Sequence, residues 1–250
     1  ERRRAAAADD AELARRRQAL RGHPCHRCPD REEHARWAER WWRLRRDTDA
    51  LARRIEQRTN TVAQTFDRVA TLLEQLGYLR GDQATPRGEQ LGRLYTELDL
   101  LAAECLRHGV WEGLGPAELA ACVSALVFER RQPDGAVAPR LPAGPTREAL
   151  AATVRLWAGL EARERELGLA VQREPDLGFA WAAYRWTQGH RLDAVLGDSD
   201  LAAGDFVRWT RQLVDLLGQI ADAAPEDGTV RPAAQAAVQA LLRGVVAQPG

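Results

Sequence analysis

The clearest periodicity in the chain lies in residues 66–129, which read FDRVATLLEQLGYLRGDQATPRGEQLGRLYTELDLLAAECLRHGVWEGLGPAELAACVSALVFE. Large apolar residues recur at its start with spacings of three and four, which predicts a helix with one apolar face. The members of this face are Phe66, Val69, Leu72, Leu73 and Leu76. Gly77 follows directly, and glycine ends helices because it adopts left-handed backbone angles without steric cost. The stretch therefore begins with an amphipathic helix that stops at residue 76.

A very short hairpin is predicted next. Residues 78–79 and 83–84 fit two small strands that flank a turn at 81–82. Thr85 is a suitable cap for the following helix, and Pro86 suits its first position. The pattern resembles the wing of a winged-helix protein.

Two more helices complete this stretch. The first covers residues 86–104, with an apolar face of Leu91, Leu94, Leu98 and Leu101. Its acidic residues outnumber its arginines, so this helix would repel phosphate rather than bind it. The other helix follows Pro116 and carries Leu119, Val123, Leu126 and Val127. Cys105 and Cys122 are interpreted as small core residues, and His108 as the end of a helix.

A long helix is predicted upstream, over residues 31–58. Apolar residues and one threonine recur there at alternating spacings of four and three, which is a coiled-coil-like seam. The seam consists of Trp37, Trp41, Leu44, Thr48, Leu51 and Ile55. Arginines occupy the other faces with acidic residues between them. This surface is either a solvated face on an antiparallel helix pair or a stalk that attracts RNA phosphates, and the interleaved acids favour the solvated face.

The segment HPCHRCPDREEH, residues 23–34, contains the CxxC pair Cys25 and Cys28 with histidines nearby. A structural zinc site needs four ligands, usually as two separated pairs. One CxxC pair is present, and the βαβ context of redox CxxC motifs is missing. The main interpretation is a turn that starts a helix, with Asp30 as cap; a metal site and a redox pair are the alternatives.

The second half of the chain begins with a predicted loop at residues 130–146, which is rich in proline. Thr146 is expected to cap the helix that follows. Residues 177–188 form a short helix with four aromatic residues, Phe179, Trp181, Tyr184 and Trp186. Aromatic side chains at this density either stack on bases or fill a core, and a core is the preferred interpretation.

Residues 205–223 predict a strongly amphipathic helix. Its buried stripe consists of Phe206, Thr210, Leu213, Leu217, Ile220 and Ala224. The opposite polar stripe consists of Arg208, Gln212, Asp215, Gln219 and Asp222, with Arg211 beside it. A solvated face is the ordinary explanation for such a stripe.

These segments together resemble the DSHCT domain, the C-terminal helical domain of exosome-associated and antiviral DExH-box RNA helicases, and resemble most the bacterial HelY-type helicases. The resemblance rests on LEQLGYL, on residues 85–129, on the segment from His23 to Phe66 and, more weakly, on GFAWAAYRWTQGHRLDAVL and FVRWTRQLVDLL. It implies that residues 1–58 end a stalk or arch insertion. Residues 59–250 would then be the DSHCT helical domain. The expected fold is all-α: a helical bundle with a small winged-helix-like hairpin, preceded by a long coiled-coil-like stalk helix.

The resemblance also implies a function. In that family RecA-like domains hydrolyse ATP, while the helical domain closes the nucleic-acid channel and its ratchet helix touches the threaded strand. FVRWTRQLVDLL corresponds to the ratchet helix, and the family's strand-contacting basic and acidic residues fall on Gln212 and Asp215. Because Gln212 is not basic, Arg208 and Arg211 are the candidates for the cationic contact. The implied partners are single-stranded RNA, with DNA as second choice, and RecA-like domains of the same protein.

Composition excludes several activities. The sequence contains no lysine, so it cannot contain the phosphate-binding loop GxxxxGK[ST]. No hydrolase motif is present either. We therefore expect no catalytic, cofactor or metal site in this chain, and we expect ATP and Mg²⁺ to bind RecA-like domains elsewhere in the parent protein.

The sequence has no methionine and begins Glu1-Arg2-Arg3-Arg4, which suggests a piece of a longer protein. No apolar run approaches a membrane span, and no secretory signal pattern is present. A cytoplasmic protein without a membrane partner is expected. The alternative function is a non-catalytic helical scaffold that binds proteins; a metal-stabilised winged-helix regulator is a third, which the acidic helix 86–104 disfavours.

Overall fold

The structure is a computed structural model that describes residues 13–130, 139–198 and 201–247. The chain divides into two compact units, Glu1–Gln64 and Thr65–Gly250, and each is described by itself. The assignment of the chain to a stalk and a DSHCT helical domain at residues 58 and 59 stays a prediction. Part of the predicted loop, residues 131–138, lies outside the described residues.

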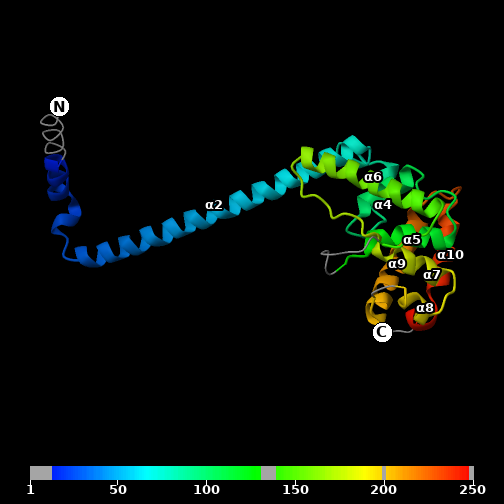
Figure 1. Cartoon of the computed structure of the whole chain (residues 1–250). Helices are drawn as coiled ribbons and strands as arrows, with labels where there is room; N and C mark the ends of the chain where they lie inside the picture. The colour runs from blue at the N-terminus through cyan, green and yellow to red at the C-terminus, as the bar shows by residue number, and fades with distance from the viewer. Residues whose placement is uncertain (1–12, 131–138, 199–200, 248–250) are drawn as a thin grey trace, which may run out of the picture. The chain divides into compact units, whose positions relative to one another are not determined.

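The first unit is mostly helical in the part that the structure describes. Residues 13–22 are helical, a 3-10 turn η1 covers Pro24–Arg27, and the long helix α2 covers Arg31–Leu76 (Figure 1). The separation of this region into two helices was therefore wrong. Residues 31–76 include neither glycine nor proline, so no residue interrupts the helical hydrogen bonds.

The apolar seam of α2 is exposed in the first unit. Its large side chains, Trp37, Trp41, Leu44, Leu51 and Ile55, are between 49% and 65% exposed. Two of the tryptophans are covered only in part by arginines, with Arg40 5.7 Å from the ring centre of Trp37 and Arg45 5.2 Å from that of Trp41. The predicted spacing is present, but these side chains are not buried within the described residues.

The second unit starts at the last turns of α2. Leu72 and Leu76 are buried as predicted, whereas Phe66 is 72% exposed and Val69 is 40% exposed. Gly77 ends the helix with a φ of +80°, and the Tyr78 N–H donates to the Leu73 carbonyl at 2.8 Å. This is the hydrogen bond across a left-handed glycine that the sequence predicts.

The predicted hairpin is present. Strand β1, Leu79–Arg80, pairs antiparallel with β2, Gln83–Ala84. Thr85 then caps α3, Pro86–Leu91, since its hydroxyl accepts from the Gly88 N–H at 3.2 Å. A Cβ atom at Gly88 would lie 2.2 Å from the Tyr78 carbonyl oxygen, so only glycine permits this close packing of helix against hairpin.

The single helix expected over residues 86–104 is instead two helices, α3 and α4, and α4 covers Asp99–Arg107. Leu94 and Leu98 are nevertheless buried, because the linker between the two helices turns them inward. The Tyr95 N–H donates to Gln219 in α9, Ala203–Ala223, rather than to a helical carbonyl. The repulsion of phosphate expected for this region stays a prediction, although Glu104, one of its acidic residues, is only 2% exposed.

The remaining helices belong to a bundle that has α5, Pro116–Val127, at its centre (Figure 1). They are α6, Pro145–Glu166; α7, Ala180–Thr187; α8, Leu192–Leu196; α9, Ala203–Ala223; and α10, Val230–Leu241, with 3-10 turns η2 at Leu177–Phe179 and η3 at Gly244–Val246. Helix α5 contacts α6, α7, α9 and α10, and α9 also packs on α10. The all-α bundle with one small hairpin is confirmed.

Three details of the bundle concern individual predictions. Cys105 and Cys122 are fully buried as expected, and burial raises the pKa of Cys105 to about 12. Thr146 does not cap α6, because the helix already begins at Pro145 and Gly144 is its N-cap. His108 is the C-cap of α4, as predicted.

A buried ionic network joins the hairpin to α4. The Tyr78 hydroxyl donates to Glu104 at 2.6 Å, and Arg107 forms two hydrogen bonds to the same carboxylate, at 2.8 and 2.5 Å. Burial alone would raise the pKa of Glu104, but the hydrogen bonds from Arg107 and Tyr78 outweigh burial, so the pKa is lowered. Burial and the bond to Glu104 raise the pKa of Tyr78. The network holds Glu104 ionised inside the fold.

We expect Glu104→Gln to destabilise the second unit by about 2 kcal/mol, because Arg107 loses its charged partner. A lowered carboxylate pKa stabilises the fold above the ordinary value of 4.5, and the stabilisation is lost as the pH falls through the lower folded-state value. Urea unfolding at several pH values measures both effects. The difference from the parent should be full at pH 7 and should shrink below about pH 4.5.

The matched control for this experiment is Glu161→Gln. Glu161 pairs with Arg165 at 2.6 Å along α6, where the glutamate side chain is 18% exposed and the arginine 65%. Pairs four residues apart on a helix with an exposed partner contribute only about 0.5 kcal/mol. Equal destabilisation by the two substitutions would contradict the assignment.

Candidate nucleic-acid interface

Helix α9 has the two faces that its sequence predicts. All six residues of the predicted buried stripe are buried: Phe206, Thr210, Leu213, Leu217, Ile220 and Ala224. The polar positions Arg208, Arg211, Gln212 and Asp215 are exposed. The apolar stripe packs on α5 and α10, so the polar face is directed away from these helices.

An open groove of about 640 Å³ runs beside the polar face of α9. Three of the four predicted site residues, Arg211, Gln212 and Asp215, line it together with Trp209 and Leu216. The other walls come from residues 95–97, before α4, and from Leu126, Val127 and Glu129, at the end of α5, with Arg173. The fold therefore brings a linker, a helix end and the predicted face of α9 together.

The fourth predicted site residue, Arg208, does not line this groove. Its guanidinium pairs with Asp205 at 3.1 Å and lies 4.4 Å from the ring centre of Trp209. Trp209 in turn meets Phe128 edge to face at 5.3 Å. Arg208 therefore covers the tryptophan that forms part of the groove wall.

Asp215 takes part in a chain of hydrogen bonds. The Gln219 side-chain amide donates to Asp215 Oδ2 at 2.8 Å, and Gln219 Oε1 accepts from the Tyr95 N–H at 2.7 Å. Arg93 also donates to the Asp222 carbonyl at 3.0 Å. Two side chains of α9 and one of its carbonyls thus hold the linker between α3 and α4.

Arg173 organises the opposite wall of the groove. It donates to the carbonyls of Leu126 and Phe128 at 2.7 and 3.2 Å, and pairs with Glu97 at 2.8 Å. The two carbonyls lie at the C-terminal end of α5, where helical carbonyls have no partner within their own helix. Arg173 is only 18% exposed, so its charge is largely used within the protein.

Sequence reasoning did not find Tyr95, Glu97, Arg173 or Trp209 as parts of this surface. Their partners are about 40 to 125 residues away in the chain, and no local pattern reports such contacts. Trp209 was the one that could have been found, because it lies in the amphipathic helix already singled out.

The aromatic residues of α7 and η2 divide into two groups. Phe179 and Trp186 are buried and pack edge to face on Phe206, which confirms the core interpretation for these two. Trp181 and Tyr184 are only partly buried and stack on each other at 6.0 Å. Arg140 lies 4.0 Å from the ring centre of Trp181, so a residue of the chain already occupies that ring face.

Comparison with known proteins identifies the family. The profile of the DSHCT (NUC185) domain matches residues 81–248, more than half of the chain. The chain belongs to the DSHCT family.

Similar proteins extend the match beyond the DSHCT region. The chain is 44% identical over 252 residues to "Probable helicase HelY" of Mycobacterium tuberculosis (strain ATCC 25618 / H37Rv), which covers 95% of this chain. It is also 44% identical to the protein of that name from Mycobacterium leprae (strain TN). The chain spans 28% and 27% of the lengths of these curated relatives. The resemblance noted from the sequence is therefore confirmed.

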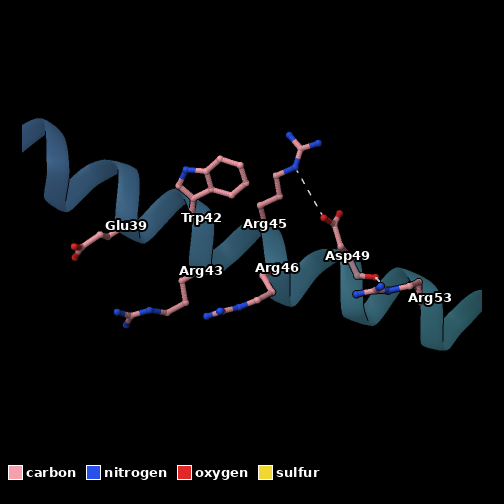
Figure 2. Close-up of a pocket in the computed structure, with 7 residues that line it drawn as sticks. All are labelled: Glu39, Trp42, Arg43, Arg45, Arg46, Asp49 and Arg53. Carbon is pink, nitrogen blue, oxygen red and sulfur yellow. Dashed lines mark hydrogen bonds and ion pairs between the residues drawn. The ribbon is translucent and has the colours of Figure 1, made fainter. Parts of the chain in front are cut away.

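A second charged surface lies on α2, upstream of the DSHCT match. Figure 2 shows Trp42 and Arg45 on one side of the helix and Arg43 and Arg46 on another, with Arg45 paired to Asp49 at 3.9 Å. One helix supplies all residues of this surface, so it has no opposing wall. The ion pair between Arg45 and Asp49 is the arrangement expected of a solvated face, and an RNA-attracting stalk stays a hypothesis.

The CxxC segment also lies upstream of the DSHCT match. Cys28 Sγ is 3.6 Å from His34 Nδ1, whereas the His23 ring accepts from the Cys25 N–H at 3.3 Å. Cys25 is exposed, and the segment forms the turn η1 just before α2. Among the residues that the structure describes, no group of three or more potential metal ligands lies close together.

No helix in the described part of the chain is long and apolar enough to cross a membrane.

We expect the purified chain to contain far less than one zinc per molecule, because Cys25 and Cys28 supply two of the four ligands that a structural site requires. Inductively coupled plasma mass spectrometry after dialysis measures the content, with Cys28→Ser as the matched control. A stoichiometric zinc content in the parent that disappears in the variant would overturn this prediction.

Proposed function

We propose that this DSHCT chain is the C-terminal nucleic-acid-channel module of an ATP-dependent superfamily-2 RNA helicase, and that it contacts the threaded single strand. The observation that carries the proposal is the groove beside α9, into which Arg211, Gln212 and Asp215 converge. Membership of the DSHCT family and similarity to proteins named probable helicases support it. RNA is the proposed strand, and DNA is the alternative.

The geometry suits sequence-independent contact with a moving strand. Helix α9 has 21 residues and is packed along its apolar stripe, so its polar side chains project from a rigid support. Arg211 supplies a cation within the groove, and Gln212 supplies an amide that donates and accepts hydrogen bonds. Arg208, held over Trp209, places a second cation one turn away. Single-strand binding without sequence preference needs only such cations and aromatic surfaces.

The proposal divides the work of the parent protein between its parts. This chain has no lysine for a phosphate-binding loop, so ATP and Mg²⁺ would bind RecA-like domains outside it. Hydrolysis there would move the strand, while α9 would support unwinding by holding the strand between steps. The RecA-like domains are thus its proposed partners within the same cytoplasmic protein.

One observation favours a second candidate function, a helical scaffold that binds proteins. The seam of α2 exposes large apolar side chains, including Trp37 and Trp41 at 60% and 49%. Apolar residues at heptad spacing form interfaces with other helices. If substitutions in this seam abolish the binding of a protein partner and leave RNA binding intact, the scaffold function is favoured.

Charge reversal at Arg208→Glu with Arg211→Glu should weaken single-stranded RNA binding by at least about tenfold, because two cations beside the groove become anions. Fluorescence anisotropy with the 250-residue chain measures affinity, and strand displacement by the longer helicase that carries the chain measures unwinding. Circular dichroism and the melting curve should not change.

The matched control reverses two exposed arginines of α6, Arg155→Glu with Arg163→Glu, which do not line the groove. It changes the net charge equally. Equal loss of binding in both double variants would mean that overall charge, not the α9 face, determines binding. If the α9 variant unwinds RNA at the parental rate, the polar face of α9 is only a solvated face with no role in unwinding.

The isolated chain should hydrolyse no ATP above a buffer blank, with or without RNA, because it lacks the lysine that contacts the β- and γ-phosphates. A coupled assay for released phosphate on a purified preparation measures this. Hydrolysis that copurifies with the chain and responds to RNA would contradict the proposal.

A further inference from the structure

Tyr95 projects from the linker between α3 and α4. It is 78% exposed, although its neighbour Leu94 is 3% exposed and Leu98 is fully buried. The buried leucines fix the direction of the linker, so the tyrosine between them has to point outward. Tyr95 lines the groove beside α9, together with Gln212 and Asp215.

The backbone of this linker is held on both sides of Tyr95. Its own N–H donates to Gln219 Oε1 at 2.7 Å, and Arg93 donates to the Asp222 carbonyl at 3.0 Å. Gln219 is oriented in turn by its 2.8 Å hydrogen bond to Asp215. These contacts fix the main chain and leave the phenol ring at the groove. An aromatic ring on a fixed backbone loses little conformational entropy when it binds a ligand.

The charges of the groove indicate which part of a strand faces it. Two arginines line it, Arg173 and Arg211, against three carboxylates, Glu97, Glu129 and Asp215. Arg173 is moreover engaged with Glu97 and with backbone carbonyls. Phosphate contacts therefore fall to Arg211 and to Arg208 beside the groove, whereas the rest of this lining suits bases, whose faces stack on aromatic rings and whose amino groups donate to carboxylates.

We propose that Tyr95 stacks on a base of a single-stranded nucleic acid that lies with its bases toward the groove, and that Asp215 and Gln219 position Tyr95. This inference rests on the function proposed above, because it concerns the same groove. Tyr95 touches the strand, whereas Gln219 and Asp215 act through the linker backbone. The role of Asp215 is therefore internal: it orients Gln219.

The experiment uses the 250-residue chain and a single-stranded RNA of roughly 12 nucleotides with 2-aminopurine at successive positions. Stacking on an aromatic ring quenches the fluorescence of this base. Tyr95→Ala should abolish the quenching at one position and weaken binding about tenfold, whereas Tyr95→Phe should retain both. The matched control is Phe66→Ala, which removes another highly exposed aromatic ring, 72% exposed and outside the groove.

Salt dependence separates stacking from phosphate contacts. Each phosphate contact to a single strand contributes a slope of about −0.7 in a plot of log K against log salt. Tyr95→Ala should leave the slope unchanged, whereas Arg208→Glu with Arg211→Glu should make it shallower. A shallower slope in Tyr95→Ala would mean that the residue acts on phosphate contacts, and would overturn the stacking assignment.

Gln219→Leu tests the positioning role, because leucine keeps the volume but cannot accept from the Tyr95 N–H. It should reduce the quenching and weaken RNA binding in the parental background, and it should cause no further loss of affinity in the Tyr95→Ala background. Additive effects would overturn the role of Gln219. If Tyr95→Ala quenches as strongly as the parent while the arginine variant still loses affinity, the inference is refuted and the proposed function stands. If the parental chain does not bind RNA at all, both are overturned.

Discussion

The burial of α5 is the constraint on which the second unit depends. Every residue from Leu119 to Leu126 is buried, so this helix has no face for water and needs neighbours on all sides. Helices α6, α7, α9 and α10 supply them. Most side chains of α5 between these two leucines are small, which lets the surrounding backbones pack closely. The bundle is therefore assembled around a helix that would be insoluble alone.

The groove is a consequence of this packing. Because the apolar stripe of α9 is used against α5 and α10, its polar stripe is left at the surface. The end of α5 at Val127 leaves carbonyls that Arg173 satisfies, and this places an arginine and Glu97 opposite α9. Tyr95 is then fixed at the rim by Gln219. A core helix, a helix end and a linker thus produce one groove, the surface for which we propose contact with a strand.

Sequence periodicity correctly predicted those features of the structure that depend only on contacts between residues close together in the chain. The two faces of α9, the stop at Gly77 and the cap at Thr85 follow from spacing and from local hydrogen bonds, and all three are present. The break between α3 and α4 was missed, although Leu94 and Leu98 are buried as expected. A buried turn can keep leucines at helical spacing, so the pattern alone does not distinguish it from a continuous helix.

The sequence by itself determined that the chain is helical, that α9 has one polar face, and that no phosphate-binding loop is present, because propensity, spacing and residue type are local properties. Only the tertiary structure decided which residues face that polar surface. Arg173 reaches the end of α5 across more than 40 residues, and Gln219 meets Tyr95 across more than 120. Such contacts depend on how helices pack, and helix packing is set by the sum of many buried side chains rather than by any one segment.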